Sequence, residues 1–183
     1  MAIDGYDIEN QAKTVGILFR HGTDTKSNSD TVITDYQNNI APYQSGQFYR
    51  RELPCIIALL DKIDKIDKID KIDLSTISTI VIDGYVHLAD GKIGLGGYLY
   101  HALDKTISII GVAKKEFSGN KPYLIEIICG QSKHPLYISA IGIHLENAAA
   151  NINSVAGKYR MPDLLSFLEQ RTQLFKFEKV SQE

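Results

Sequence analysis

The chain has 183 residues, of which 44% are hydrophobic, and its formal net charge at neutral pH is −2. This length suits one domain with a sizeable core. The small charge excludes a protein that binds nucleic acid through a strong overall positive charge, although it allows a local basic patch. No apolar stretch is long enough to span a bilayer, and the first residues lack the basic and apolar segments of a signal peptide, so we expect a soluble cytoplasmic protein.

Three strands are predicted before the first helix. They cover residues 1–6, 12–19 and 31–36. The first strand ends near Asp4, and residues 7–10 (Asp-Ile-Glu-Asn) predict a hairpin turn to the second. The polar residues 20–30 predict a loop. The third strand alternates between apolar and polar residues only in part, which favours an edge position in the sheet.

A helix is predicted over residues 46–60, where apolar residues recur on one face. Glu52 lies near its start beside two arginines, and its simplest interpretation is a solvated glutamate paired with them. Residues 61–73 repeat Asp-Lys-Ile, a period that fits no long straight helix because the apolar stripe drifts around the axis. We interpret this repeat as a solvated helical extension or a flexible insert, and regard a partner-binding stripe as the less favoured alternative.

The central stretch of the chain is 78–85, where the β-branched residues 80–82 predict a strand buried on both faces. Asp83 ends this strand, and Gly84 follows it. A carboxylate at the carboxyl end of a central strand in an α/β sheet commonly contacts a ligand or metal. The same Asp-Gly pair also suits an ordinary turn, and this stretch alone does not separate the two interpretations.

The remaining sequence predicts a mixed α/β domain. After a glycine-rich segment, the expected elements are a helix at 98–103, a strand at 106–112, a β-hairpin formed by 123–129 and 136–141, and helices at 145–155 and 162–174. Cys55 and Cys129 lie in apolar stretches, so we expect buried thiols rather than a disulfide or a metal site. We expect a single domain over 1–183, with helices on both faces of a mixed sheet and a frayed tail at 176–183.

Four polar residues fall at comparable places in this scheme. Asp4 and Asp83 end two strands that we expect to be neighbours. Glu52 lies in the intervening helix, and Lys114 follows another strand. Converging carboxylates are the oxygen ligands that Mg²⁺ prefers, and carboxylate-held Mg²⁺ suits phosphodiester hydrolysis. A lysine beside them can offset charge on the phosphate, and no nucleophile elbow or Walker loop competes with this set.

Three stretches of the chain resemble the endonuclease V family. They are 42–54 (Pro-Tyr-Gln-Ser-Gly-Gln-Phe-Tyr-Arg-Arg-Glu-Leu-Pro), 81–84 (Val-Ile-Asp-Gly) and 110–114 (Ile-Gly-Val-Ala-Lys), in the order and spacing of the family. The resemblance extends from Ala2 to about Thr172. It implies a ribonuclease H-like α/β fold, with a central mixed sheet flanked by helices. It also implies an endonuclease that depends on Mg²⁺, with Mn²⁺ as a possible substitute, and that nicks DNA or RNA 3′ to inosine in the repair of damaged nucleic acid.

The resemblance assigns roles position by position. The expected site residues are Asp4 and Asp83 as metal carboxylates, Glu52 as a third acid that binds metal or orients water, and Lys114 as a contact of the scissile phosphate. Tyr43 and Gly46 belong to the loop that wedges into the duplex in the family, where an aromatic ring can stack on an exposed base. The alternative for Tyr43 is a ring that covers the first helix. Gly84 and Gly94 would let the backbone approach the extruded base.

The chain also departs from the family pattern. Its wedge loop contains Pro-Tyr-Gln-Ser-Gly rather than Pro-Tyr-Ile-Pro-Gly, and Ala-Asp-Gly stands at 89–91 where the family has a His-Pro-Arg triplet. The family's metal-site histidine lies in a Ser-x-Gly-His motif, near which this chain offers only His144, out of register. His144 is therefore a candidate metal ligand, with a surface histidine at a helix start as the alternative.

These departures affect the residues expected to recognise the base more than the acidic residues expected to bind the metal. The first hypothesis is a monomeric metal-dependent endonuclease acting on deaminated nucleic acid, with no organic cofactor and no membrane partner. The second is a related nuclease with a changed specificity. The third is a non-catalytic module that binds nucleic acid, which the near-neutral charge and the missing basic triplet would suit.

Overall fold

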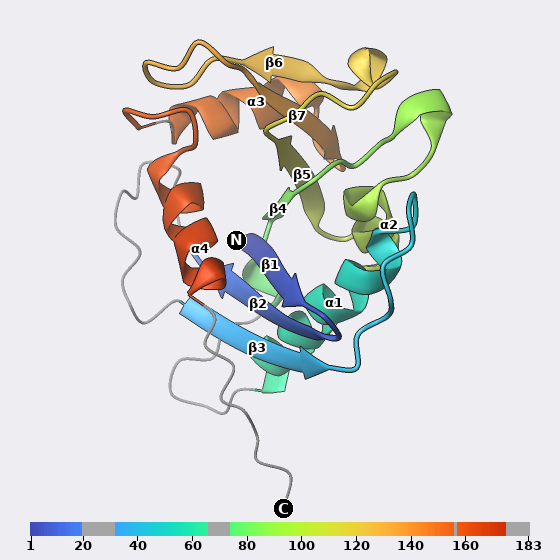
Figure 1. Ribbon diagram of the computed structural model, residues 1–183. Helices are drawn as coiled ribbons and strands as arrows, with labels where there is room; N and C mark the ends of the chain where they lie inside the picture. Colours follow the sequence, from blue (N-terminus) through green and yellow to red (C-terminus); the bar gives the residue numbers. More distant parts are fainter. Residues whose placement is uncertain (20–31, 66–73, 156, 175–183) are drawn as a thin grey trace, which may run out of the picture.

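The structure is a computed structural model that describes residues 1–19, 32–65, 74–155 and 157–174. Its centre is a seven-stranded mixed sheet with the order β3-β2-β1-β4-β5-β7-β6 (Figure 1). The strands are β1 (Ala2–Ile8), β2 (Gln11–Ile17), β3 (Val32–Asn38), β4 (Thr79–Asp83), β5 (Ser108–Ala113), β6 (Ile125–Ile127) and β7 (Leu136–Ile141). Strands β1, β4 and β5 run parallel to one another, and the other pairs are antiparallel.

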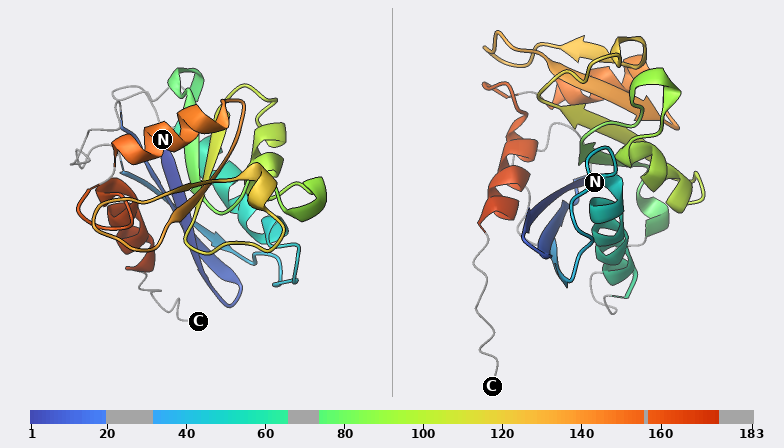
Figure 2. Two further views of the ribbon diagram at one scale, coloured as in Figure 1. Left: turned by 90° about the horizontal axis from the view of Figure 1, so that it is seen from above. Right: turned by 45° about the vertical axis from the view of Figure 1, so that its right-hand side comes forward.

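In the described residues, four α-helices cover the two faces of the sheet (Figure 2). They are α1 (Tyr49–Lys65), α2 (Leu95–Ala102), α3 (Leu145–Ser154) and α4 (Asp163–Gln173). Helices α1 and α2 pack on one face, and α3 and α4 pack on the other. None of the helices in the described residues is both long enough and apolar enough to cross a membrane.

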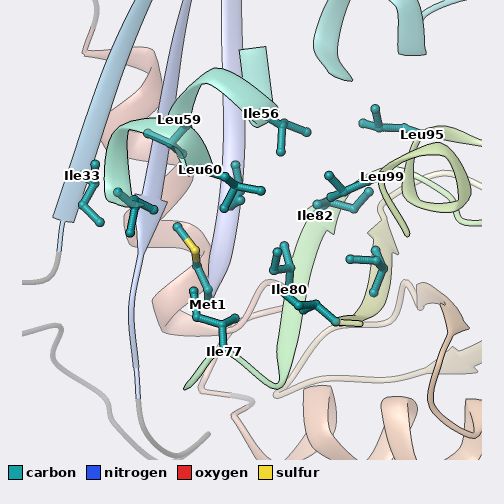
Figure 3. Close-up of a cluster of buried hydrophobic side chains, with 14 of the residues drawn as sticks. Met1, Ile33, Ile56, Leu59, Leu60, Ile77, Ile80, Ile82, Leu95 and Leu99 are labelled. Atoms are coloured by element: carbon teal, nitrogen blue, oxygen red, sulfur yellow. The ribbon is translucent and has the colours of Figure 1, made fainter. Parts of the chain in front are cut away.

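Strand β4 joins the two cores because its side chains alternate between them. Ile80 and Ile82 point into the core under α1 and α2, and Val81 points into the core under α3 and α4. All three are almost fully buried. Figure 3 shows Leu59 and Leu60 of α1 on the same side of the sheet as Ile80 and Ile82. The β-branched run therefore forms a strand buried on both faces, as its sequence predicts.

Several expected boundaries shift for physical reasons. Strand β1 continues past Asp4 to Ile8 because it pairs along its whole length with β2, with Ile8 opposite Gln11. The predicted hairpin turn is thereby confined to two residues. Helix α2 begins at Leu95 rather than at residue 98 and includes Gly96, where a Cβ atom would press against Val86.

The other elements lie where they are predicted, although β6 covers only Ile125–Ile127 of the predicted 123–129 and α1 begins at Tyr49 rather than at residue 46. Strand β3 is an edge strand, and β6 and β7 form the expected antiparallel pair. Of the Asp-Lys-Ile repeat, residues 61–65 continue α1, so the helical interpretation holds for them. Residues 66–73, the loop at 20–30 and the tail at 176–183 lie outside the described residues.

Candidate active site

Polar side chains from three neighbouring strands meet where the parallel pairing of these strands ends. Ile3 of β1 is opposite Ile82 of β4, so Asp4 and Asp83 follow side by side. Asp83 is opposite Val112 of β5, and Lys114 comes two residues later. Parallel strands bring their carboxyl ends together, so this arrangement follows directly from the topology.

Asp4, Asp83 and Lys114 line one small cavity, and α4 closes its other side. The cavity has a volume of about 30 Å³, enough for one or two water-sized groups. Glu169 and Leu168 of α4 also line it. The two aspartates, the lysine and the glutamate therefore line the same cavity.

Asp4 is held by two hydrogen bonds. The backbone N–H of Gly5 donates to Oδ1 at 2.9 Å, and the Thr172 hydroxyl is 2.7 Å from Oδ2. Thr172 is 1% exposed, so α4 delivers this hydroxyl from inside the protein. Burial raises the pKa of Asp4, and the two hydrogen bonds act in the opposite direction.

Asp83 has a pKa raised from 3.8 to about 6. The side chain is solvent-accessible, yet protein atoms surround it closely, and the lost hydration is the largest cause. The negative charge of Asp4 raises the pKa further, Lys114 lowers it, and Glu169 raises it slightly. The site thus gathers carboxylates that repel one another, which is the electrostatic setting that a bound cation relieves.

Glu52 approaches the same carboxylates from α1, on the other side of the sheet edge. Burial raises its pKa well above the ordinary value, and the charges of Asp83 and Asp4 raise it further. Arg51 does not pair with Glu52. Its guanidinium forms an ion pair with Asp7 and donates to the carbonyl oxygen of Ala41 at 2.8 Å. The interpretation of Glu52 as a solvated, arginine-paired residue is therefore wrong.

A larger cavity of about 320 Å³ lies on the α1 side of the site. Asp4, Asp83 and Glu52 line it together with Gly84 and Phe48. Gly84 has φ of +130°, a conformation that side-chain-bearing residues rarely adopt, so glycine is required where the chain turns away from Asp83. The cavity therefore adjoins the carboxylates.

The predicted wedge loop lies beside this cavity. The ring of Tyr43 is 67% exposed and makes an edge-to-face contact with Phe48, with ring centroids 6.3 Å apart. Gly46 turns the loop with φ of +76°, and a Cβ atom there would meet nothing within 4 Å. Tyr43 is thus an exposed ring next to a cavity-lining ring. It does not bury itself against the helix.

Two predicted site residues lie elsewhere. Gly94 is buried, and a Cβ atom there would collide with the carbonyl oxygen of Tyr85, so this glycine serves close packing rather than the approach of a base. His144 follows β7, whose last residue Ile141 is opposite Ile109 near the start of β5. The candidate site lies beyond the opposite end of β5. His144 is therefore far from the carboxylates, and the expectation that it binds the same metal is wrong.

Glu169 and Thr172 are the site residues that sequence reasoning missed. Lys114 Nζ donates to Glu169 Oε1 at 2.5 Å, across 55 positions of sequence. The only sequence signal for them is their place next to Leu168 on the inward side of a helix. That signal does not indicate which strand the helix packs against.

The carboxylates suit a metal held by few protein ligands. Within the described residues, no three His, Cys, Asp or Glu side chains lie close enough together to form a ready-made metal site. Mg²⁺ is commonly bound by one or two carboxylates, with water and substrate phosphate completing an octahedron. The adjacent pair Asp4 and Asp83, with its raised pKa values, fits that pattern in donor type and charge.

Comparison with solved structures identifies the fold. The chain is similar to human ENDOV, with 18% identity over 94% of this chain and 82% of that one, and a TM-score of 0.65. It is similar to endonuclease V from Bacillus subtilis, with 15% identity over 94% and 78%, and a TM-score of 0.67. Endonuclease V from Ciona intestinalis, solved with DNA containing an inosine, gives 15% identity over 94% and 84%, and a TM-score of 0.67. No family model and no curated protein matches the chain.

These similarities confirm the ribonuclease H-like α/β fold that the sequence motifs imply. The likeness extends over 94% of this chain. At this level of identity it establishes the architecture, and the chemistry has to be argued from the residues of the candidate site.

Proposed function

We propose that this chain is an endonuclease of the endonuclease V type, which uses a divalent cation to hydrolyse a phosphodiester bond 3′ to inosine in DNA or RNA. The observation that carries the proposal is that Asp4 and Asp83 lie side by side where the parallel strands β1 and β4 stop pairing, in the fold of endonuclease V. The proposed role is the repair of deaminated nucleic acid.

Asp4 and Asp83 would hold Mg²⁺ or Mn²⁺ between them. When bound there, the cation supplies Lewis-acid polarisation of the phosphate and a lower pKa for the attacking water. Thr172 and the Gly5 N–H keep the Asp4 carboxylate in one orientation. Such supporting hydrogen bonds fix ligand geometry and tune affinity.

Glu52 and Lys114 would serve the two sides of the reacting phosphate. Glu52 lines the larger cavity beside the aspartates, and its raised pKa suits a group that orients water and accepts its proton near neutral pH. Lys114 is a flexible cation on the opposite side, where it can compensate charge on the phosphate. Glu52, which would face the water, and Lys114, which would face the phosphate, thus come from different faces of the sheet.

The larger cavity is the proposed place for the extruded base. Its volume of about 320 Å³ is at the lower end of small-ligand sites. Gly84 provides open backbone, and Phe48 provides an aromatic surface. Tyr43 stands exposed beside Phe48, where a ring can stack on a neighbouring base.

The test is cleavage of labelled oligonucleotides in Mg²⁺ or Mn²⁺ and in EDTA, with wild type, Asp4→Asn and Asp83→Asn. Metal-dependent cutting by wild type, with a loss of at least a hundredfold in each variant, would support the proposal. Asp104→Asn is a matched control, because Asp104 is exposed, lies before β5 at the other end of the sheet, and has φ of 51°, which asparagine tolerates. Equal activity of wild type and Asp83→Asn would refute the site assignment.

A second candidate is a related nuclease with changed specificity. The observation that favours it is the loop around the exposed Tyr43, which carries Gln-Ser where the family has Ile-Pro. A more flexible and more polar loop would hold a flipped base less firmly. Equal cutting of inosine-containing and unmodified substrates would select this candidate, and tight binding without any cutting would select the non-catalytic module.

A further inference from the structure

Three loops that are far apart in the sequence carry an excess of positive charge near the site. They are 114–117 after β5, 129–135 before β7 and 157–161 before α4. Their basic residues are Lys114, Lys115, Lys133, Lys158 and Arg160. Glu116 is their only acidic residue. Because the whole chain has a net charge of −2, this concentration of cations is a local feature.

Arg160 holds the three loops together. Its guanidinium donates to the carbonyl oxygen of Pro135 at 2.6 Å and also to the carbonyl oxygen of Lys114. The backbone N–H of Gln131 donates to the carbonyl oxygen of Lys158 at 3.0 Å. Figure 1 shows the loop before β7 beside the loop before α4. The three loops therefore form one surface, which we call the three-loop surface.

The exposed side chains of the three-loop surface suit a strand of nucleic acid. Lys115, Lys133 and Lys158 are exposed, and within the described residues none of them forms an ion pair. Tyr159 is 67% exposed, and the Lys158 ammonium lies 5.9 Å from the centre of its ring. Grooves that hold a single strand combine cations, which contact phosphates, with aromatic rings on which bases stack.

The three-loop surface begins at the candidate active site. Lys114 and Met161 both line the small cavity at the two aspartates. Tyr159 comes two residues before Met161, and Lys115 directly follows Lys114. The Tyr43 loop lies beside the larger cavity on the α1 side, so the three-loop surface extends the site in a different direction. A strand with one phosphate at Lys114 can therefore continue over this surface.

We propose that the three-loop surface binds unpaired nucleotides of the cut strand on one side of the scissile phosphate. Lys115, Lys133 and Lys158 contact the phosphates of this strand, and one base stacks on Tyr159. Bases inside a duplex have their faces covered by neighbouring bases, so this stacking requires unpaired nucleotides. The inference rests on the proposed function for the position of the scissile phosphate.

The experiment measures the binding of fluorescent single-stranded oligonucleotides by anisotropy in EDTA, so it needs no turnover. Each oligonucleotide contains one inosine and extends for about ten nucleotides on only its 5′ side or only its 3′ side. Tyr159→Ala should bind one of the two about tenfold more weakly than wild type, as expected when one base loses its stacking partner, and should bind the other unchanged. Tyr159→Phe keeps the ring and should bind both like wild type.

A double variant, Lys133→Ala with Lys158→Ala, tests the phosphate contacts. It should weaken binding of the same oligonucleotide, and the slope of log affinity against log salt concentration should fall by about 1.4, because each single-strand phosphate contact contributes about 0.7. Lys105→Asn is the matched control. Lys105 is exposed, precedes β5 at the other end of the sheet, and has φ of 61°, which asparagine tolerates. This control should change neither the affinity nor the slope.

The inference is overturned if these variants weaken both oligonucleotides equally or weaken neither, or if Tyr159→Phe binds as weakly as Tyr159→Ala. Displacement of the oligonucleotide by polyglutamate as readily as by unlabelled oligonucleotide would assign the surface to an acidic protein and also overturn it.

Failure of the proposed function gives a different result. A wild-type protein that shows the one-sided dependence on Tyr159 but never cuts would refute the nuclease and leave the three-loop surface standing. A protein that cuts 3′ to inosine while every variant binds like wild type would overturn the inference and support the nuclease.

Discussion

Replacing Asp83 by asparagine should stabilise the metal-free protein above neutral pH while removing its activity. A carboxyl whose pKa rises from 3.8 to about 6 on folding binds its proton more tightly in the folded state. Its ionisation therefore opposes folding, by about 3 kcal/mol at 1.36 kcal/mol for each pKa unit. Because the side chain is solvent-accessible, screening reduces this to about 1 kcal/mol.

The sign of the effect fixes its pH dependence. Well below pH 3.8 the carboxyl is protonated in both states, so wild type and Asp83→Asn should be equally stable. The advantage of the variant should grow between pH 4 and 6 and stay constant above about pH 7, where the penalty of ionisation in wild type is complete. For a protein of this size, about 1 kcal/mol raises Tm by roughly 2–4 °C.

The assay is thermal denaturation of wild type and Asp83→Asn in EDTA at several values between pH 4 and 8. Asp104→Asn, at an exposed aspartate with no site contact, should show no such growing difference. Two results would refute the reasoning. One is an Asp83→Asn variant that is no more stable than wild type at pH 8, and the other is a gain that is the same at pH 4 and pH 8.

Three further predictions concern the surroundings of the carboxylates. Thr172→Val removes the hydroxyl that contacts Asp4, and calorimetry should show cation affinity about tenfold weaker; an unchanged affinity would mean that this contact does not orient the ligand. Arg51→Ala removes the guanidinium that holds Ala41, which precedes the Tyr43 loop. The free energy of unfolding, measured by chemical denaturation, should fall by about 3 kcal/mol, and proteolysis of residues 39–47 should become faster. Equal rates of proteolysis in wild type and variant would contradict that role. Gly111→Ala places a Cβ atom 2.5 Å from the carbonyl oxygen of Gly84. The free energy of unfolding, measured by chemical denaturation, should fall by about 2 kcal/mol. An unchanged stability would show that the strand shifts easily to make room.

Much of the fold follows from local sequence pattern. The β-branched run before Asp83 predicts a strand buried on both faces, and the structure places Ile80 and Val81 in different cores. Parallel pairing then brings Asp83 beside Asp4, because Ile3 is opposite Ile82 and the next residue of each strand follows on the same side. The two aspartates could be predicted as a pair from residue type and position alone.

The rest of the site depends on contacts between distant parts of the chain. Glu169 reaches Lys114 only because α4 packs across β1, and the pattern of a helix does not identify the strand that it covers. His144 lies away from the site because β7 runs antiparallel to β5, and the sequence of a strand does not indicate its direction in the sheet. Glu52 loses its expected arginine partner because Arg51 turns to Asp7, 44 residues earlier in the chain. Pairings of this kind are fixed by tertiary packing and leave no periodic trace in the sequence.

The most direct test of the central claim is nucleotide-resolution mapping of cuts in end-labelled DNA and RNA, single- and double-stranded, each with one inosine or with adenosine at the same position. The reactions are run in Mg²⁺ and in EDTA. The proposed function predicts a nick on the 3′ side of inosine in Mg²⁺ only, with the adenosine substrates intact. Absence of cutting from every substrate in Mg²⁺, by a folded protein, would contradict it.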